Sequence, residues 1–511
     1  MILRTTLKNI LIIGLTMAMT SSAIAQTKEA KISIDPGKTY QAISNFSASD
    51  AWACQFVGNW PDAKRNAIAD LLFSTQNKAD GSPKGIGLNM WRFNIGAGST
   101  EQGSEGGIRD EWHRAESFYN ADGFYNWQKQ AGQLWFLKAA KERGVKEFLG
   151  FTNSPPVKFT INGRAFADKG KVNIAPEKYI DFATYLADVV KGVEKTAKIK
   201  FNYISPFNEP QWDWSDNKQE GSPYTNAEIA GAVKVMDKVF TNRKIKSKLI
   251  IAEAGQINYL YTKSNKPGKG MQIADFFRLG SANYIGNLPT VAHTVTAHSY
   301  FTTSPLASSI KMRKALADSV AAIKGLDFWQ SEYCILGDNA GEINGNKRDL
   351  GMDAALYMAS VIHTDLAVAN ASAWQWWLAI SAYDYKDGLI YVDKNKTDGN
   401  FYTSKMLWVL GNYSRFIKPG SVRVDVSVLA DGLAKPLMVS AYKKGRELVI
   451  VVVNQNTEEV NIDLADVPFK AGQLSSYVTS QIDELKLNNV NSAKVNIPKR
   501  AVVTLTGKLT N

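Results

Sequence analysis

Residues 201–214 read FNYISPFNEPQWDW, an apolar run suited to a β-strand that ends in an Asn-Glu-Pro turn flanked by two tryptophans. The turn places a carboxylic acid, Glu209, beside the amide of Asn208 and the indole ring of Trp212. Such a set can bind a sugar by stacking and hydrogen bonds while the acid donates a proton. An ordinary strand-to-helix turn is the alternative, so the surrounding chain has to decide.

Seven further apolar runs share this design, in which a strand is followed by a polar or Gly-rich loop and then by a helical pattern. Apolar strands that alternate with helices predict a parallel sheet buried on both faces, and eight such units close into a (β/α)8 barrel. An open doubly wound sheet is the alternative, but Ser49-Asp50-Ala51-Trp52 is not the glycine fingerprint expected after its first strand. The eight runs are 42–48, 87–95, 147–152, 201–205, 249–252, 294–300, 326–331 and 371–378.

Helical patterns fill most intervals between these runs. Pro176 suits a first helical turn because its φ angle is fixed, and the Asn226-Ala-Glu-Ile stretch suits a helix start capped by a side chain. The expected helices are 63–73, 128–143, 176–194, 227–240, 310–323 and 351–368.

The pattern changes after Lys418-Pro419-Gly420, where short alternating strands follow without long helices. This change predicts a C-terminal β-sandwich, and the short strand 31–35, ended by Pro36-Gly37, is expected to pair with it. The expected organisation is a signal peptide over 1–25, an N-terminal strand segment over 26–44 that joins the β-domain, the catalytic barrel over 45–417 and the β-sandwich over 418–511. Its expected strands are 422–428, 437–442, 447–453, 460–464, 474–478, 493–497 and 501–506.

The N-terminus has the three regions of a secretory signal. Arg4 and Lys8 precede an apolar run over 10–19, and the small-residue stretch Ala23-Ile24-Ala25 follows. Cleavage before Gln26 would give a periplasmic or secreted protein. The apolar run is too short to span a membrane comfortably, and no other stretch approaches its length, so no membrane span is expected.

Composition excludes several classes of protein. Two cysteines, Cys54 and Cys334, cannot form a disulfide framework and are expected to be free, largely buried thiols. The formal net charge of +12 is spread along the chain without a dense basic block, which argues against nucleic-acid binding. No cofactor or protein partner is implied, and a monomer is expected.

Acidic residues follow three of the expected strands: Glu209 the fourth, Glu253 the fifth and Glu332 the seventh. Because parallel barrel strands meet at one face, these acids are candidates for one site. Two carboxyls there suit glycoside hydrolysis, in which one protonates the leaving oxygen and the other attacks the anomeric carbon or activates water. The four histidines show no ligand spacing with acids or cysteines, so no metal is expected; they are His113, His293, His298 and His363.

These residues resemble a known group of enzymes. Asn208-Glu209-Pro210 after the fourth strand, with Glu332 after the seventh, resembles the acid/base and nucleophile pattern of the clan A retaining glycosidases. Finer motifs and the trailing β-domain resemble glycoside hydrolase family 30, from about Tyr40 to the C-terminus, and most of all its endo-β-1,6-galactanase branch. The motifs are residues 46–52 (FSASDAW), 91–96 (WRFNIG) and 152–156 (TNSPP).

The resemblance implies roles for individual residues. Glu209 would be the acid/base, Glu332 the nucleophile, and Asn208 a partner of the sugar 2-hydroxyl. Arg92 would lie beside the nucleophile and hold it ionised, and Tyr300 would donate a hydrogen bond to Glu332.

Further residues are expected to bind substrate or to support the acids. Glu253 is expected to support the acid/base through a hydrogen bond, and His298 to pack or bind a neighbour. Trp376 is expected to be a sugar platform, and the long loop 96–118 to shape the cleft. The remaining candidates for substrate binding or support are Asp50, Trp52, Asn153 and Trp212.

The expected activity is a retaining double displacement on a β-linked polysaccharide, with β-1,6-galactan as the first choice of substrate. Endo-β-1,6-glucanase, xylanase and a glucosylceramidase-like enzyme are the alternatives, because related branches share this barrel. A catalytically silent glycan-binding protein is the alternative from another class. Such a protein would not need both Glu209 and Glu332 at strand ends.

Overall fold

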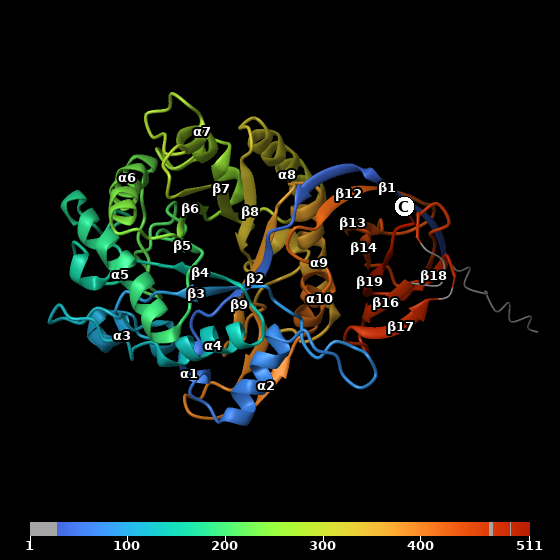
Figure 1. Ribbon diagram of the computed structural model, residues 1–511, viewed down its shortest axis with the longest axis horizontal. Helices are drawn as coiled ribbons and strands as arrows, with labels where there is room; N and C mark the ends of the chain where they lie inside the picture. Colours follow the sequence, from blue (N-terminus) through green and yellow to red (C-terminus); the bar gives the residue numbers. More distant parts are fainter. Residues whose placement is uncertain (1–27, 470–473, 491, 511) are drawn as a thin grey trace, which may run out of the picture.

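The computed structural model describes residues 28–469, 474–490 and 492–510 of the chain. Two units lie side by side: a barrel ringed by helices, and a smaller domain of strands that carries the C-terminus (Figure 1). The expected signal peptide and its cleavage before Gln26 lie outside the described residues. In the described part of the chain, no helix is long and apolar enough to cross a membrane.

Eight parallel strands form the closed barrel, as the apolar runs predict. They pair in chain order from β2 to β9, and β9 closes the ring by pairing with both β2 and β8. The fold class is therefore confirmed as a (β/α)8 barrel. Its strands are β2 (Asn45–Ser49), β3 (Met90–Asn94), β4 (Glu147–Phe151), β5 (Tyr203–Ser205), β6 (Lys248–Ala254), β7 (Val291–His298), β8 (Asp327–Glu332) and β9 (Ala373–Ser381).

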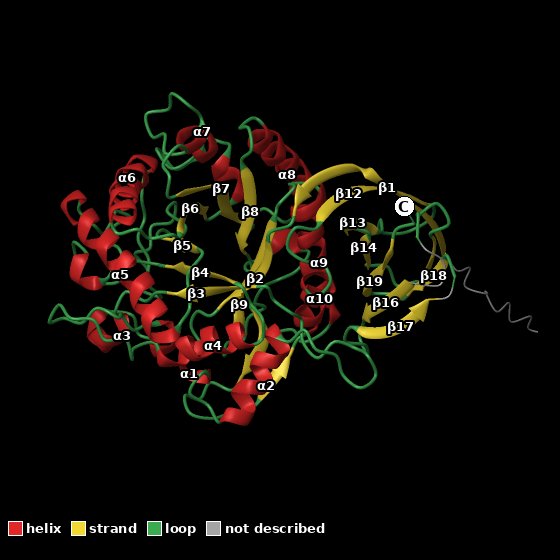
Figure 2. Cartoon of the chain, viewed as in Figure 1, coloured by secondary structure: helices red, strands yellow, loops and turns green. Residues whose placement is uncertain are grey.

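Helices surround the barrel (Figure 2). Pro176 opens a short 3-10 turn, Pro176–Lys178, which leads directly into α5. Helix α6 starts at Asn226, but its cap is Thr225, which forms a capping box with Glu228. The helices are α1 (Cys54–Val57), α2 (Asp62–Phe73), α3 (Ser99–Gln102), α4 (Ala131–Glu142), α5 (Tyr179–Ala197), α6 (Asn226–Asn242), α7 (Gln272–Phe277), α8 (Leu306–Ala321), α9 (Met352–Ala367) and α10 (Lys405–Ser414).

Three elements after β9 go beyond the expected pattern. Strand β10 (Gly388–Val392) pairs parallel to the end of β9, and β11 (Phe401–Thr403) pairs antiparallel to β10. Helix α10 follows, begun by the side chain of Ser404, which accepts from the backbone N–H of Leu407. Every residue of α10 is buried, so it lacks the polar face by which a surface helix is recognised.

Within the described residues, the second domain has nine strands that enclose their own apolar core. Strand β1 (Lys28–Ala42) joins it by pairing antiparallel to β12 and parallel to β15, and Pro36-Gly37 shifts its register instead of ending it. Besides β1, the strands are β12 (Val422–Ala430), β13 (Met438–Lys444), β14 (Glu447–Asn454), β15 (Val460–Asp463), β16 (Leu474–Thr479), β17 (Lys486–Val490), β18 (Lys494–Ile497) and β19 (Ala501–Lys508). Of these, β17 lies outside the expected strands.

The two units share an interface on the α9–α10 side of the barrel (Figure 1). Asn412 of α10 donates to the carbonyl of Tyr477 and to the hydroxyl of Thr504, 3.1 Å and 2.9 Å away. Cys54 and Cys334 are free and buried, as expected. Because the second domain packs against α9 and α10, on the side of the barrel, the C-termini of the barrel strands remain at a face formed by the barrel's own loops.

Candidate active site

The three predicted acids meet at the C-terminal mouth of the barrel. Glu209 follows β5, Glu253 lies near the end of β6, and Glu332 ends β8. Their exposed fractions are 7%, 0% and 3%. Carboxylates this deeply buried require partners, and the neighbouring strands supply them.

Glu332 is held by a cation and a phenol. Arg92 of β3, itself fully buried, donates through Nη1 to Glu332 Oε2. Tyr300, just beyond β7, donates its hydroxyl to Glu332 Oε1 at 3.1 Å. The expected contacts of Arg92 and Tyr300 with this carboxylate are therefore present in the structure.

His298, the last residue of β7, lies between the other two acids. Its Nδ1 is 2.9 Å from Glu209 Oε1, and its Nε2 is 3.0 Å from Glu253 Oε2. Glu332 Oε1 is 3.4 Å from Nδ1. Burial disfavours the charged ring, but the three carboxylates outweigh it and raise the pKa of His298 to about 10.

Glu253 is surrounded by donors. Ser205 donates to Oε1 at 3.1 Å, Ser331 donates to Oε2 at 2.5 Å, and Arg92 Nη2 lies 3.9 Å from Oε2. Burial alone would raise the pKa of Glu253, yet the charges of Arg92 and His298 and these hydrogen bonds lower it to about 2. These partners therefore favour the ionised form of Glu253. Glu253 contacts the carboxyl of Glu209 through the ring of His298, and its backbone carbonyl accepts from the N–H of Glu209 at 2.9 Å, in keeping with the expected support by hydrogen bonds.

Glu209 has the opposite electrostatic character. Burial raises the pKa of Glu209, and the nearby charge of Glu332 adds to this effect, although His298 opposes it. Its backbone has φ of 43°, its N–H donates to the carbonyl of Glu253 at 2.9 Å, and its carbonyl accepts from the indole of Trp214 at 3.0 Å. A strained residue that its surroundings hold in place is common where a side chain must be aimed.

The carboxyl groups of Glu209 and Glu332 are close together. One oxygen of Glu209, one of Glu332 and a ring nitrogen of His298 all lie within 4.8 Å of one another. Retaining glycosidases hold their two carboxyl groups about 5–5.5 Å apart, whereas inverting enzymes leave room for water at roughly 6.5–9.5 Å. The geometry matches retention.

Several buried polar atoms beside these acids have no hydrogen-bond partner within the described chain. They include Asp50 Oδ2, Asn94 Nδ2, Asn153 Oδ1 and Asn208 Oδ1, all at strand ends. Burial raises the pKa of Asp50 well above its usual range, so its free oxygen can carry a proton. A mixture of donors and acceptors that lack partners suits the hydroxyl groups of a sugar.

Aromatic side chains form two walls around the mouth. On one side, the ring of Trp52 lies 4.3 Å from that of His113 and 5.3 Å from that of Trp377. His113 belongs to the long loop 96–118, so this loop packs against Trp52, one of the residues expected to bind substrate. On the other side, the ring of Trp212 meets that of Phe301 edge-on at 6.2 Å, and Phe301 is 58% exposed.

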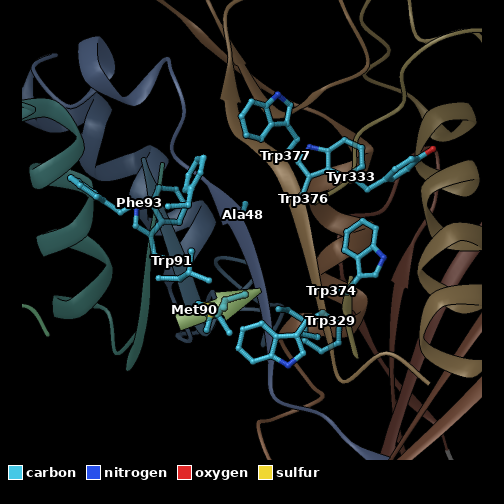
Figure 3. Packing of buried hydrophobic residues seen from close by; sticks show 14 of the residues in the cluster. Ala48, Met90, Trp91, Phe93, Trp329, Tyr333, Trp374, Trp376 and Trp377 are labelled. Atoms are coloured by element: carbon cyan, nitrogen blue, oxygen red, sulfur yellow. The ribbon is translucent and has the colours of Figure 1, made fainter. Parts of the chain in front are cut away.

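Trp376 does not belong to either wall. Its ring is fully buried, stacks on Trp374 at 6.0 Å, and donates its N–H to the carbonyl of Asp387 at 2.6 Å. Figure 3 shows it packed beside Tyr333. The expectation of a sugar platform at Trp376 is therefore wrong, because no face of its ring is open to a ligand.

One buried acid that the sequence did not single out shapes this region. Glu220 accepts from the backbone N–H groups of Ala97 and Ser99 at 3.0 Å and 3.2 Å, and from the Ser99 hydroxyl at 2.6 Å. It thereby ties the loop after β5 to the loop after β3. No sequence signal marks Glu220, since it stands in a polar loop that resembles many others.

The cluster of Glu209, His298 and Glu332 has the donor atoms of a metal site, but these atoms already serve one another. Both ring nitrogens of His298 face carboxylate oxygens, and Glu332 faces Arg92 and Tyr300. A cationic guanidinium and a ring whose two nitrogens are both engaged compete with a metal ion for these carboxylates. The arrangement suits proton transfer and nucleophilic attack.

Comparisons with known proteins place the chain among glycoside hydrolases. A solved structure of a conserved exported protein from Bacteroides fragilis is 35% identical, with a TM-score of 0.85, and covers 93% of this chain and 100% of that one. An endo-β-1,6-galactanase from Hypocrea rufa is 23% identical over 409 residues, 77% of this chain and 75% of that protein.

The catalytic domain of a family 30 xylanase C from Talaromyces cellulolyticus has a TM-score of 0.67 at 20% identity, and the match covers 94% of this chain and 100% of that one. The model of O-glycosyl hydrolase family 30 matches residues 29–391, most of the chain. The chain therefore belongs to O-glycosyl hydrolase family 30 and is a retaining glycoside hydrolase.

Proposed function

We propose that the protein is a secreted endo-β-1,6-galactanase in which Glu332 is the nucleophile and Glu209 the acid/base. The observation that carries the roles is the proximity of these two carboxyls, one paired with Arg92 and the other raised in pKa by burial. The substrate is supported by the similarity to the Hypocrea rufa enzyme, which spans most of both chains.

The first half of the reaction forms a glycosyl-enzyme. Glu332 attacks the anomeric carbon while Glu209 passes a proton to the departing oxygen, so the leaving group departs as a neutral alcohol. Arg92 and Tyr300 orient the attacking carboxylate. The unpartnered atoms of Asp50, Asn153 and Asn208 bind the sugar hydroxyls.

The second half reverses the role of Glu209. Once Glu332 is esterified it carries no charge, so its contribution to the raised pKa of Glu209 disappears. Glu209 then acts as a base toward the water that attacks the anomeric carbon. The same carboxyl is thus an acid before the intermediate and a base after it.

The Glu209→Ala variant tests the acid role. Proton transfer of this kind contributes roughly 100 to 10,000-fold, so the variant should lose that much activity on natural glycan. A dinitrophenyl glycoside needs no acid assistance, and its cleavage to the glycosyl-enzyme should be nearly unaffected. Equal losses on both substrates would sink the assignment.

A panel of glycans tests the substrate. We expect β-1,6-galactan to be cut to a ladder of oligosaccharides, and β-1,6-glucan and xylan to be cut far more slowly. Sizing the early products separates endo from exo cleavage. Export is tested on the same preparation, since the protein recovered from periplasm or medium should begin at Gln26.

A further inference from the structure

Glu253 fixes the protonation of one nitrogen of His298. The carboxylate of Glu253 already accepts from Ser205 and Ser331 and lies near Arg92, so it is an acceptor only. The nitrogen that faces it at 3.0 Å, Nε2, must therefore carry a hydrogen. The state of the ring then depends on Nδ1 alone.

Nδ1 faces Glu209 Oε1 at a hydrogen-bonding distance of 2.9 Å. A ring that holds a proton on Nδ1 donates it to an ionised Glu209. A neutral ring instead accepts a proton from a protonated Glu209. In either case one proton lies between the two residues, and neither arrangement requires any atom to move far.

We propose that His298 and Glu253 are positioning residues that make Glu209 and His298 share one transferable proton, which is given up in the acid step and recovered in the base step. This inference rests on the role of Glu209 proposed above. It adds that the acid/base function belongs to Glu209 and His298 together, and that the carboxylate of Glu253 holds the other nitrogen of the His298 ring.

The proton balance of the cycle is simple. In the acid step the bond between the anomeric carbon and the leaving oxygen breaks, the bond to Glu332 forms, and the shared proton goes to the leaving oxygen. The carboxylate of Glu209 then faces the lone pair of Nδ1, an unfavourable contact that strengthens its affinity for a proton. Attacking water forms its bond to the anomeric carbon, Glu332 departs, and the pair recovers a proton.

The charged and titratable groups that pack against the ring come from several barrel elements. Besides Glu209 and Glu253, Glu332 of β8 lies 3.4 Å from Nδ1, and the ring of Tyr300 lies 5.8 Å from that of His298. Arg92 of β3 contacts Glu332 and lies near Glu253. Glu253 is the group whose charge acts on the ring without facing the substrate.

Two variants of Glu253 test the proposal through the pH profile of kcat/KM. Glu253→Gln removes the charge that favours the extra proton, so the alkaline limb should move by about one unit or more toward lower pH. Glu253→Asp keeps the charge and should leave the limb near its wild-type position even if kcat falls. His293→Gln, at the far end of β7 where His293 Nε2 meets the carbonyl of Lys324, is the matched control.

If the alkaline limb of the pH profile of kcat/KM does not shift in Glu253→Gln, and kcat falls equally in both Glu253 variants, then Glu253 serves only packing. A second measurement uses the folded wild-type protein and does not depend on catalysis. The chain has four histidines, so ring nitrogens labelled with ¹⁵N give few signals, and loss of one set in His298→Gln assigns them.

We expect Nε2 of His298 to keep its hydrogen from pH 5 to 9, while Nδ1 shows a shift between those of a protonated and a bare nitrogen. A bare Nε2 in that range would overturn the proposal even if Glu209 is the acid/base. Conversely, the expected nitrogen shifts together with full activity in Glu209→Ala would show that the shared proton exists but serves no catalysis.

Discussion

Two buried arginine–carboxylate pairs lie in the same barrel and differ in how completely they are bonded. Arg313 of α8 donates through Nε to Asp365 of α9 at 2.7 Å, and through Nη1 to the carbonyl of Thr302 at 2.7 Å. Asp365 also accepts from the indole of Trp374 at 3.0 Å. All three guanidinium nitrogens of Arg313 have partners.

The pair at the mouth is incomplete by comparison. Arg92 donates to Glu332, but its Nε and Nη2 have no hydrogen-bond partner in the described chain, and its guanidinium lies over the ring of Phe151 at 4.0 Å. Glu332 in turn lies near the carboxyl of Glu209 and the ring of His298. A satisfied pair holds elements together, whereas an unsatisfied one keeps its charge available for a reaction.

The largest effect should come from the nucleophile. Glu332→Ala removes the group that forms the glycosyl-enzyme, so kcat on any glycoside should fall by about 10⁴-fold or more. Added azide can enter the space of the lost carboxylate and attack directly, giving a glycosyl azide of opposite anomeric configuration. Product analysis by NMR reads this out, and a variant with full activity would end the assignment.

The satisfied pair should behave in the opposite way. Asp365→Ala leaves the buried charge of Arg313 without its partner, which should lower the free energy of unfolding by about 3–5 kcal/mol. Denaturant unfolding measures that loss. kcat/KM per folded molecule should stay within a few-fold of wild type; a catalytic loss as large as that of Glu332→Ala would erase the distinction between the two pairs.

The sequence predicted the eight strands, because buried parallel strands are long apolar runs and their ends are marked by polar residues. It therefore also predicted that Glu209, Glu253 and Glu332 share one face. It did not predict β11 or β17, whose runs are short or polar, nor β10, a short apolar run outside the eight strand-and-helix units, nor α10, which is buried on all sides. Periodicity carries no signal for such elements.

Side-chain partners were harder to predict than strand ends. The contacts of Arg92 and Tyr300 with Glu332 were expected from the resemblance to a family. The position of His298 between two acids was not, since it depends on the exact orientation of three strands. Trp376 was misjudged because a run such as Trp374-Gln375-Trp376-Trp377 does not say which rings face the core.

The pH dependence of stability should also separate the two regions. The pKa of His298 rises from about 6.5 in the unfolded chain to about 10 in the fold. Its stabilising contribution is therefore complete below pH 6.5 and is lost as pH rises toward 10, with a slope approaching ~1.4 kcal/mol per pH unit. Unfolding of wild type and His298→Gln at pH 6 and pH 9 measures this.

The difference in free energy of unfolding between wild type and His298→Gln should become smaller from pH 6 to pH 9. The matching variant of the satisfied pair, Asp365→Ala, removes no histidine, so its gap from wild type should change little over the same range. A gap for His298→Gln that stays constant with pH would mean that the ring is neutral in the folded protein.

The smallest pair of effects concerns single hydrogen bonds. Asn208 Oδ1 has no partner in the described chain, whereas Ser309 Oγ accepts from Arg313 Nη1 at 2.9 Å. One hydrogen bond is worth roughly 0.5–1.5 kcal/mol, so Asn208→Ala should lower kcat/KM by up to about tenfold and leave stability nearly unchanged. Ser309→Ala should instead lower stability by about 1 kcal/mol and leave kcat/KM unchanged.

Both substitutions remove one polar group and leave the Cβ atom in place, so their comparison contrasts an oxygen without a partner and a bonded one. If Asn208→Ala destabilises the fold as much as Ser309→Ala and spares kcat/KM, then the unpartnered oxygen is not directed at substrate. The contrast between the bonded framework and the unbonded atoms at the mouth would then fail, since Asn208 adjoins the proposed acid/base and Oδ1 has no hydrogen-bond partner in the described chain.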